Sequence, residues 1–101
     1  MTAVSRSYRK ELLQALTDPI EAAEYLNAAL EEGTPEVFLL ALRNVAEAHG
    51  VSHIAEASKL NRESMYRMLS KAGNPKLTSL SAILETMGLE LSVKVKEATP
   101  I

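Results

Sequence analysis

The sequence predicts one mainly α-helical domain over residues 1–101, built from five to six helices and ending in one short β-strand. The length suits a single hydrophobic core. The composition, 47% apolar and only 4% aromatic, favours helices because its many Ala and Leu side chains lose little entropy there. Gly and Pro residues divide the chain at helix-length intervals, and strict alternation of apolar and polar residues occurs only after Gly88.

Two helices in the first half begin with the same signal, a capping residue followed by proline. Asp18-Pro19 predicts a helix that ends at Gly33, and Thr34-Pro35 predicts a second that ends at Gly50. Before them, residues 8–16 are expected to form a short helix. Apolar residues follow at helical spacing in both longer helices: Ile20, Ala23, Leu26 and Leu30, then Val37, Leu40, Ala41, Val45 and Ala48.

Three shorter helices are predicted after Gly50. Ser52 is expected to cap the first, and Asn61 the second, which leaves only residues 59–61 to turn the chain between them. Thr78 is expected to cap the third, which stops at Gly88.

Residues 89–96 alternate apolar and polar side chains, which predicts a half-buried β-strand. A lone strand leaves its backbone donors and acceptors unpaired, so it needs a partner. Residues 3–8 could supply it, or the same strand of a second subunit could. We expect a homodimer, because two identical antiparallel strands are self-complementary. The dimerisation residues would be Leu89, Leu91, Val93 and Val95.

The net charge of −2 hides an uneven distribution. Residues 1–50 hold four basic and eight acidic side chains, a net charge of −4, whereas residues 51–101 hold seven basic and five acidic, a net charge of +2. Within residues 51–78 the balance is five basic to two acidic. Cations gathered in this way suit phosphate binding, although a solvated helix face with a few lysines would show the same pattern.

The sequence gives little support for a catalytic site or a metal site. Gly50 separates His49 from His53 and breaks the helical face that a metal pair needs, and there is no Cys to complete a zinc site. The glycines are dispersed as helix stops rather than gathered in a phosphate loop. We therefore expect no enzyme activity, no cofactor and no metal ion. The lack of Cys and of any apolar run of about 18 residues predicts a cytoplasmic protein without membrane contact.

Residues 52–70 meet several requirements of a helix-turn-helix at once. Ala55 is small where two steeply crossing helices approach each other. The apolar residues available for the shared core are Ile54, Leu60, Met65 and Leu69. The second helix keeps a polar side for the major groove, formed by Arg62, Glu63, Tyr66 and Arg67.

The predicted DNA-contacting residues are Asn61, Arg62, Glu63, Ser64, Tyr66, Arg67, Lys71, Asn74 and Lys76. Arg62 and Arg67 are expected to reach guanine or phosphate, and the residues after the helix to hold the DNA backbone without reading sequence. Glu63 could accept from cytosine or could only stabilise the helix dipole. Asn61 could bind phosphate or only cap the helix, and Tyr66 could contact a thymine methyl group or only cover the core.

The motifs SHIA at 52–55, NRESMYRMLS at 61–70 and GNPKL at 73–77 resemble the Xre/Cro-type helix-turn-helix of HigA-like addiction-module antidote proteins. Residues 18–31 and 41–46 are similar to the same family. The resemblance implies a lambda-repressor-like helix-turn-helix and the antitoxin of a bacterial type II toxin-antitoxin pair. Such an antitoxin binds a RelE/HigB-like toxin directly and, as a homodimer, binds a double-stranded DNA operator and represses its own operon.

Lys59 departs from that family, whose members usually have glycine at this position of the turn. A left-handed residue other than glycine costs on the order of 1 kcal/mol, which is small beside a domain stability of about 5 to 15 kcal/mol. The fold therefore tolerates Lys59, and the sequence leaves the geometry of the turn open. Two other functions stay open: a stand-alone phage-type transcriptional repressor, and a protein-interaction module without DNA binding.

Overall fold

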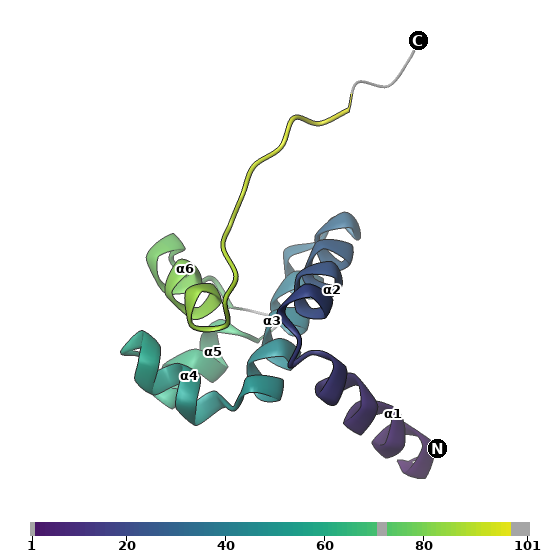
Figure 1. The fold of residues 1–101 in the computed structure, drawn as a ribbon. Helices are drawn as coiled ribbons and strands as arrows, with labels where there is room; N and C mark the ends of the chain where they lie inside the picture. The colour runs from purple at the N-terminus through teal and green to yellow at the C-terminus, as the bar shows by residue number, and fades with distance from the viewer. Residues whose placement is uncertain (1, 71–72, 98–101) are drawn as a thin grey trace.

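The computed structural model describes residues 2–70 and 73–97, which form six α-helices and no β-strand. The helices are α1 Thr2–Ala15, α2 Pro19–Glu31, α3 Pro35–His49, α4 Val51–Ser58, α5 Arg62–Met68 and α6 Leu77–Thr86. Helices α2 and α3 pack side by side, α1 leaves this pair in one direction, and α4, α5 and α6 gather on its other side (Figure 1). The prediction of a mainly α-helical protein is confirmed.

Two of the predicted helix caps form. Asp18 Oδ1 accepts the backbone N–H of Ile20 at 3.0 Å, and Asn61 Oδ1 accepts that of Ser64 at 3.1 Å. Each oxygen satisfies one of the N–H groups that a helix start leaves unpaired, which stabilises a helix by about 1 kcal/mol. Thr34 also stands at a cap position, before α3, but its side chain makes no capping hydrogen bond.

Three predicted helix starts are wrong. At α4, Gly50 takes the cap position predicted for Ser52, because glycine tolerates the φ of 94° found there and its carbonyl oxygen accepts the first hydrogen bond of the helix at 3.1 Å. At α6, Lys76 takes the position predicted for Thr78, and its carbonyl oxygen likewise accepts the first bond at 2.9 Å. Helix α1 begins well before the predicted range 8–16.

Helix α3 lies at the centre of the core. It packs against α1, α2 and α4, and its residues Leu42, Val45 and Ala46 are fully buried. Helix α4 packs in turn against α5 and α6. The other large side chains that are fully buried are Leu16, Ile54, Met65, Leu69 and Ile83. Burial of one such side chain stabilises the fold by about 1.5 to 3 kcal/mol. Helices α4 and α5 are therefore anchored in the same core as the other helices of the described chain.

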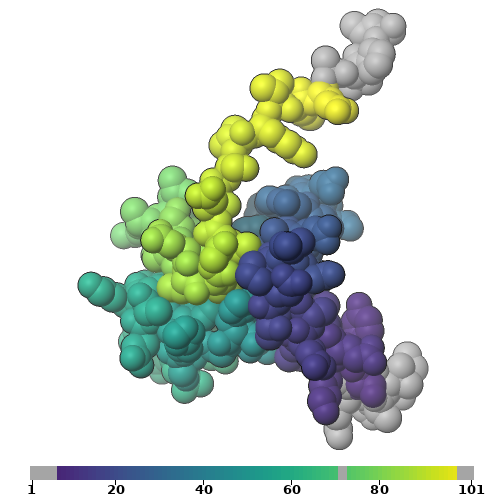
Figure 2. Space-filling view, viewed as in Figure 1, coloured from purple at the N-terminus to yellow at the C-terminus, as the bar shows by residue number. Residues whose placement is uncertain are grey.

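Residues 89–97 do not form the predicted strand. They leave α6 as a single extended segment that projects from the helices (Figure 2). Leu89 is half-buried, but the exposed fraction rises to 42% at Leu91, 99% at Val93 and 92% at Val95. The segment 3–8 cannot pair with them, because it is part of helix α1. A strand requires a hydrogen-bonding partner, and the described part of one chain offers none beside this segment.

Candidate nucleic-acid interface

Helices α4 and α5 are joined by the short turn that the sequence predicts. Lys59 is left-handed, with φ 60° and ψ 35°, and is the single non-glycine residue with positive φ in the described chain. The Leu60 N–H donates to the Ala55 carbonyl oxygen at 2.8 Å, which closes α4 with a Schellman turn. The same turn brings the Leu60 side chain against the core. The structure thus accommodates Lys59 in the left-handed conformation that glycine would adopt without strain.

Helix α5 has one buried and one exposed side. Met65 and Leu69 are buried, whereas Arg62, Glu63 and Arg67 are exposed. Because the apolar side is fixed in the core, the two arginines are presented to solvent from a rigid helix. Guanidinium groups held in this way suit two-point hydrogen bonding to phosphate or to a guanine edge.

Tyr66 is half-buried rather than free on the exposed side of α5. The guanidinium Cζ of Arg43, in α3, lies 5.1 Å from the centroid of the Tyr66 ring. A cation over an aromatic face at this distance is attracted by the ring quadrupole. The sequence does not reveal this role of Arg43, because no local pattern relates a position in α3 to one in α5.

Arg43 also belongs to a polar network that links α1, α2 and α3. Its Nε donates to Glu47 at 3.3 Å, and Glu47 also forms an ion pair with Arg9 of α1. Arg9 donates to the Asn44 side-chain oxygen at 3.3 Å, and the Asn44 amide donates to the Tyr25 hydroxyl of α2 at 2.9 Å. The guanidinium of Arg43 is thus oriented by the Glu47 carboxylate as well as by the Tyr66 ring.

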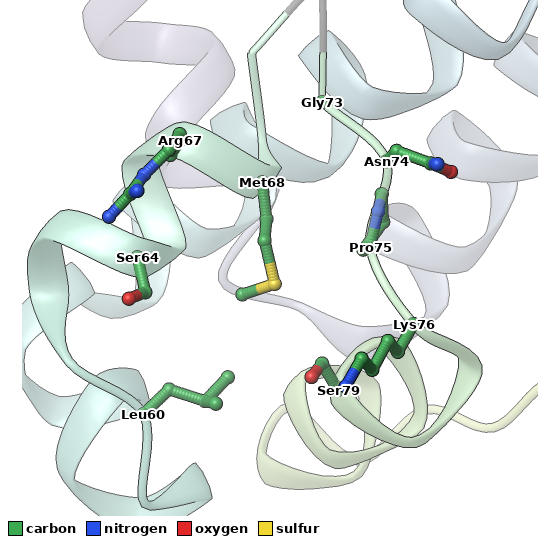
Figure 3. Close-up of a pocket in the computed structure, with 9 residues that line it drawn as sticks. All are labelled: Leu60, Ser64, Arg67, Met68, Gly73, Asn74, Pro75, Lys76 and Ser79. Atoms are coloured by element: carbon green, nitrogen blue, oxygen red, sulfur yellow. The ribbon is translucent and has the colours of Figure 1, made fainter.

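A groove of about 530 Å³ opens between α5 and the segment that leads into α6. It is lined by Leu60, Ser64, Arg67, Met68, Gly73, Asn74, Pro75, Lys76 and Ser79. Figure 3 shows Ser64 and Arg67 on the α5 side and Lys76 on the α6 side, with Met68 between them. Arg67 and Lys76 are both exposed, so each side of the groove has a cation. Charge-assisted hydrogen bonds from such a pair suit an anionic phosphate.

One wall of the groove depends on a close backbone approach at Gly73. The Gly73 N–H donates to the Ser70 carbonyl oxygen at 2.9 Å, and a Cβ added to Gly73 would overlap the carbonyl oxygen of Met68. Only glycine fits there without a shift of the backbone. The sequence marks Gly73 as a helix stop, but the contact with Met68 depends on how the chain folds back.

The groove collects four of the nine residues predicted to contact DNA: Ser64, Arg67, Asn74 and Lys76. Four others, Asn61, Arg62, Glu63 and Tyr66, do not line it. Arg62 and Glu63 occupy the first turn of α5, which Asn61 caps. Tyr66 contacts Arg43, and Lys71 lies outside the described residues.

Over 2–70 and 73–97, no three His, Cys, Asp or Glu side chains come together in a way that could hold a metal ion. Within the same ranges, no helix is both long and apolar enough to cross a membrane.

Comparison with known proteins relates most of the chain to one family. Residues 8–95 match the family described as "Probable addiction module antidote protein". A protein of Haemophilus influenzae, named only "Uncharacterized protein", is 32% identical over 84 residues, which cover 83% of this chain and 87% of that relative. No solved structure matches the chain at a significant level.

Proposed function

The chain belongs to the family of addiction module antidote proteins, and on this premise we propose that it is the antitoxin of a type II toxin-antitoxin module in the cytoplasm. It binds a RelE/HigB-like toxin directly. As a homodimer of Xre type it also binds operator DNA and represses its own operon.

The observation that supports DNA binding is the pair of exposed arginines on α5. Arg62 and Arg67 extend from a helix whose other side is fixed by buried Met65. One two-point contact from arginine to guanine discriminates against a wrong base by about 1 to 3 kcal/mol. Lys76 and Asn74, on the opposite side of the groove, hold the phosphate backbone and set the position of α5.

The extended segment 89–97 supports a dimer. Residues 90–97 are exposed in the single chain, Leu91, Val93 and Val95 among them, and pairing with a second copy of the same segment would bury these side chains and satisfy the backbone. A linked dimer presents two α5 helices to operator half-sites about 34 Å apart. The homodimer is therefore required for the proposed binding to operator DNA.

Toxin binding is supported by the family and by charge. The half of the chain before residue 51 has a net charge of −4, which complements a basic, RNA-cleaving partner. A stand-alone repressor would bind DNA without such a partner, and a pure interaction module would bind the partner without DNA. Assays of both activities separate the three functions.

A gel shift with the DNA upstream of the gene tests the proposed repressor. The wild-type protein should shift this DNA in the presence of excess unrelated DNA, and Arg62→Ala with Arg67→Ala should abolish the specific shift. Lys10→Glu changes the net charge by the same two units at an exposed position of α1, outside both α5 and segment 89–97, and should leave the shift in place. Specific binding that survives loss of both α5 arginines would refute this assignment of the DNA-reading helix.

The salt dependence of the shift gives an independent measurement. Each phosphate contact that is lost should reduce the slope of log affinity against log salt by about 0.9. Lys76→Ala should reduce the slope and weaken binding to all sequences alike, since a phosphate contact carries no base information.

A further inference from the structure

A second groove, of about 300 Å³, lies between α2 and α3 and shares no lining residue with the groove beside α5. Its lining includes Tyr25, Ala28, Glu32, Val37, Leu40 and Asn44. Val37 and Leu40 are 37% and 39% exposed, although both are large apolar side chains on the helix that forms the centre of the core. A preformed apolar hollow of this size accepts one or two large side chains of a partner protein.

Hydrogen bonds hold one end of this groove in place. The Asn44 amide donates to the Tyr25 hydroxyl at 2.9 Å and so ties α3 to α2. Arg9 donates to the side-chain oxygen of the same Asn44 at 3.3 Å. The polar groups at this end therefore bind one another, which leaves the apolar part of the groove as the surface that a partner can desolvate at little cost.

The elements that form the groove are strongly acidic. Residues 18–42 contain no Lys or Arg and six carboxylates: Asp18, Glu21, Glu24, Glu31, Glu32 and Glu36. Glu21, Tyr25, Ala28 and Glu32 follow one another at spacings of four, three and four, so they lie along one stripe of α2. Tyr25, Ala28 and Glu32 of this stripe line the groove, and Glu21 extends the stripe by one turn beyond it.

These six carboxylates are not neutralised within the described chain. The ion pairs that form between described residues both use Glu47, which Arg9 and Arg43 share. Six like charges within residues 18–36 attract a positively charged protein from a distance of about one Debye length, roughly 8 Å at physiological salt.

We infer that the α2–α3 groove is the docking surface for the toxin, an inference that rests on the antitoxin role proposed above. The partner presents an apolar side chain that enters beside Val37 and Leu40, flanked by Lys or Arg residues that meet the carboxylates of α2. The apolar contact supplies most of the affinity, and the charges speed association and select a basic partner. Because α5 is no part of this surface, the antitoxin holds toxin and DNA at the same time.

The test uses the purified product of the reading frame adjacent to this gene and measures its dissociation constant by titration calorimetry. Ala28→Arg and Leu40→Arg each introduce a cation into the groove and should raise the dissociation constant at least about tenfold. Leu77→Arg, an exposed apolar residue of α6, adds the same charge away from the groove and should change it by less than about twofold. Ala28 is exposed on a helix, so Ala28→Arg should fold normally, as circular dichroism would verify.

A second pair of matched variants tests how charge contributes to toxin binding. Glu32→Lys should weaken toxin binding and reduce its salt dependence, whereas Glu85→Lys, an exposed residue of α6, should do neither. Ala28→Arg should still shift operator DNA with unchanged affinity, because it lies outside α5.

The outcomes separate this inference from the antitoxin role. If the wild-type protein does not bind the adjacent gene product, the toxin partner proposed above is wrong, and so is the docking surface inferred for that partner. If the wild type binds and both arginine variants bind equally well, the antitoxin role stands and the docking surface is wrong.

Discussion

Arg43 of α3 holds its guanidinium 5.1 Å from the centre of the Tyr66 ring in α5. The contact joins the central helix of the core to the helix that we propose reads DNA, and Glu47 orients the same arginine through a hydrogen bond of 3.3 Å. Tyr66 and Arg43 are both partly exposed, so the attraction is modest. It is the contact that links the polar network of α1, α2 and α3 to α5.

The Arg43–Tyr66 contact should appear as a coupling free energy of about 0.5 to 1 kcal/mol. A double-mutant cycle with Arg43→Met and Tyr66→Leu, measured by urea unfolding, isolates it from the bond between Arg43 and Glu47. Tyr66→Phe keeps the ring and should keep the coupling. Additive effects of the two substitutions on the free energy of unfolding would show that the contact does not contribute to stability.

Lys59→Gly should leave the free energy of unfolding unchanged or raise it by up to about 1 kcal/mol, because glycine adopts the left-handed conformation without strain. Thermal unfolding followed by circular dichroism measures the change. Lys59→Ala is the matched control, since it removes the charge but keeps the strain. A clear loss of stability in Lys59→Gly alone would contradict the left-handed assignment.

Gly73→Ala should lower the free energy of unfolding by about 1 to 3 kcal/mol, because its new methyl group would overlap the Met68 carbonyl oxygen. The same shift of the backbone should distort the groove beside α5 and weaken operator binding. Gly33→Ala is the control: φ is +88° there and no atom lies within 4 Å of the added Cβ, so only a strain of about 1 kcal/mol is expected. Equal stability losses in the two variants would argue against the close approach at Gly73.

Val93→Pro should produce monomers in sedimentation experiments and weaken operator binding, because proline removes a backbone donor that a paired strand needs. The unfolding free energy of the monomer should hardly change, since Val93 is 99% exposed. Val93→Thr keeps the backbone N–H and should remain dimeric. A proline variant that is still a dimer would place the subunit interface elsewhere.

The helices and two of their caps follow from local sequence. Asp18 and Asn61 accept hydrogen bonds from residues two or three positions ahead, so the signal and its effect lie within one turn of the chain. The left-handed conformation of Lys59 could not be assigned in this way, because lysine carries no local signal for positive φ. At the other helix starts, backbone carbonyls of Gly50 and Lys76 act without any side-chain signal.

Long-range features could not be predicted. The alternation over residues 89–96 predicts a strand correctly only if a partner is present, and the chain places its N-terminal segment in a helix instead. The contact between Arg43 and Tyr66, and that between Gly73 and Met68, depend on the packing of the helices and on the path of the chain after α5. For the candidate site, sequence identified the exposed cations Arg67 and Lys76 but not the groove that lies between them.

The separation of acidic α2 from basic α5 gives this molecule an electric dipole that its net charge of −2 conceals. In the field of a polyanion such as DNA, a dipole experiences a torque before any side chain makes contact. The end that includes residues 18–42 is turned away, and the end that includes Arg62 and Arg67 is turned inward. Encounters thus begin already aligned, which shortens the rotational search that a uniformly charged protein of this size would need.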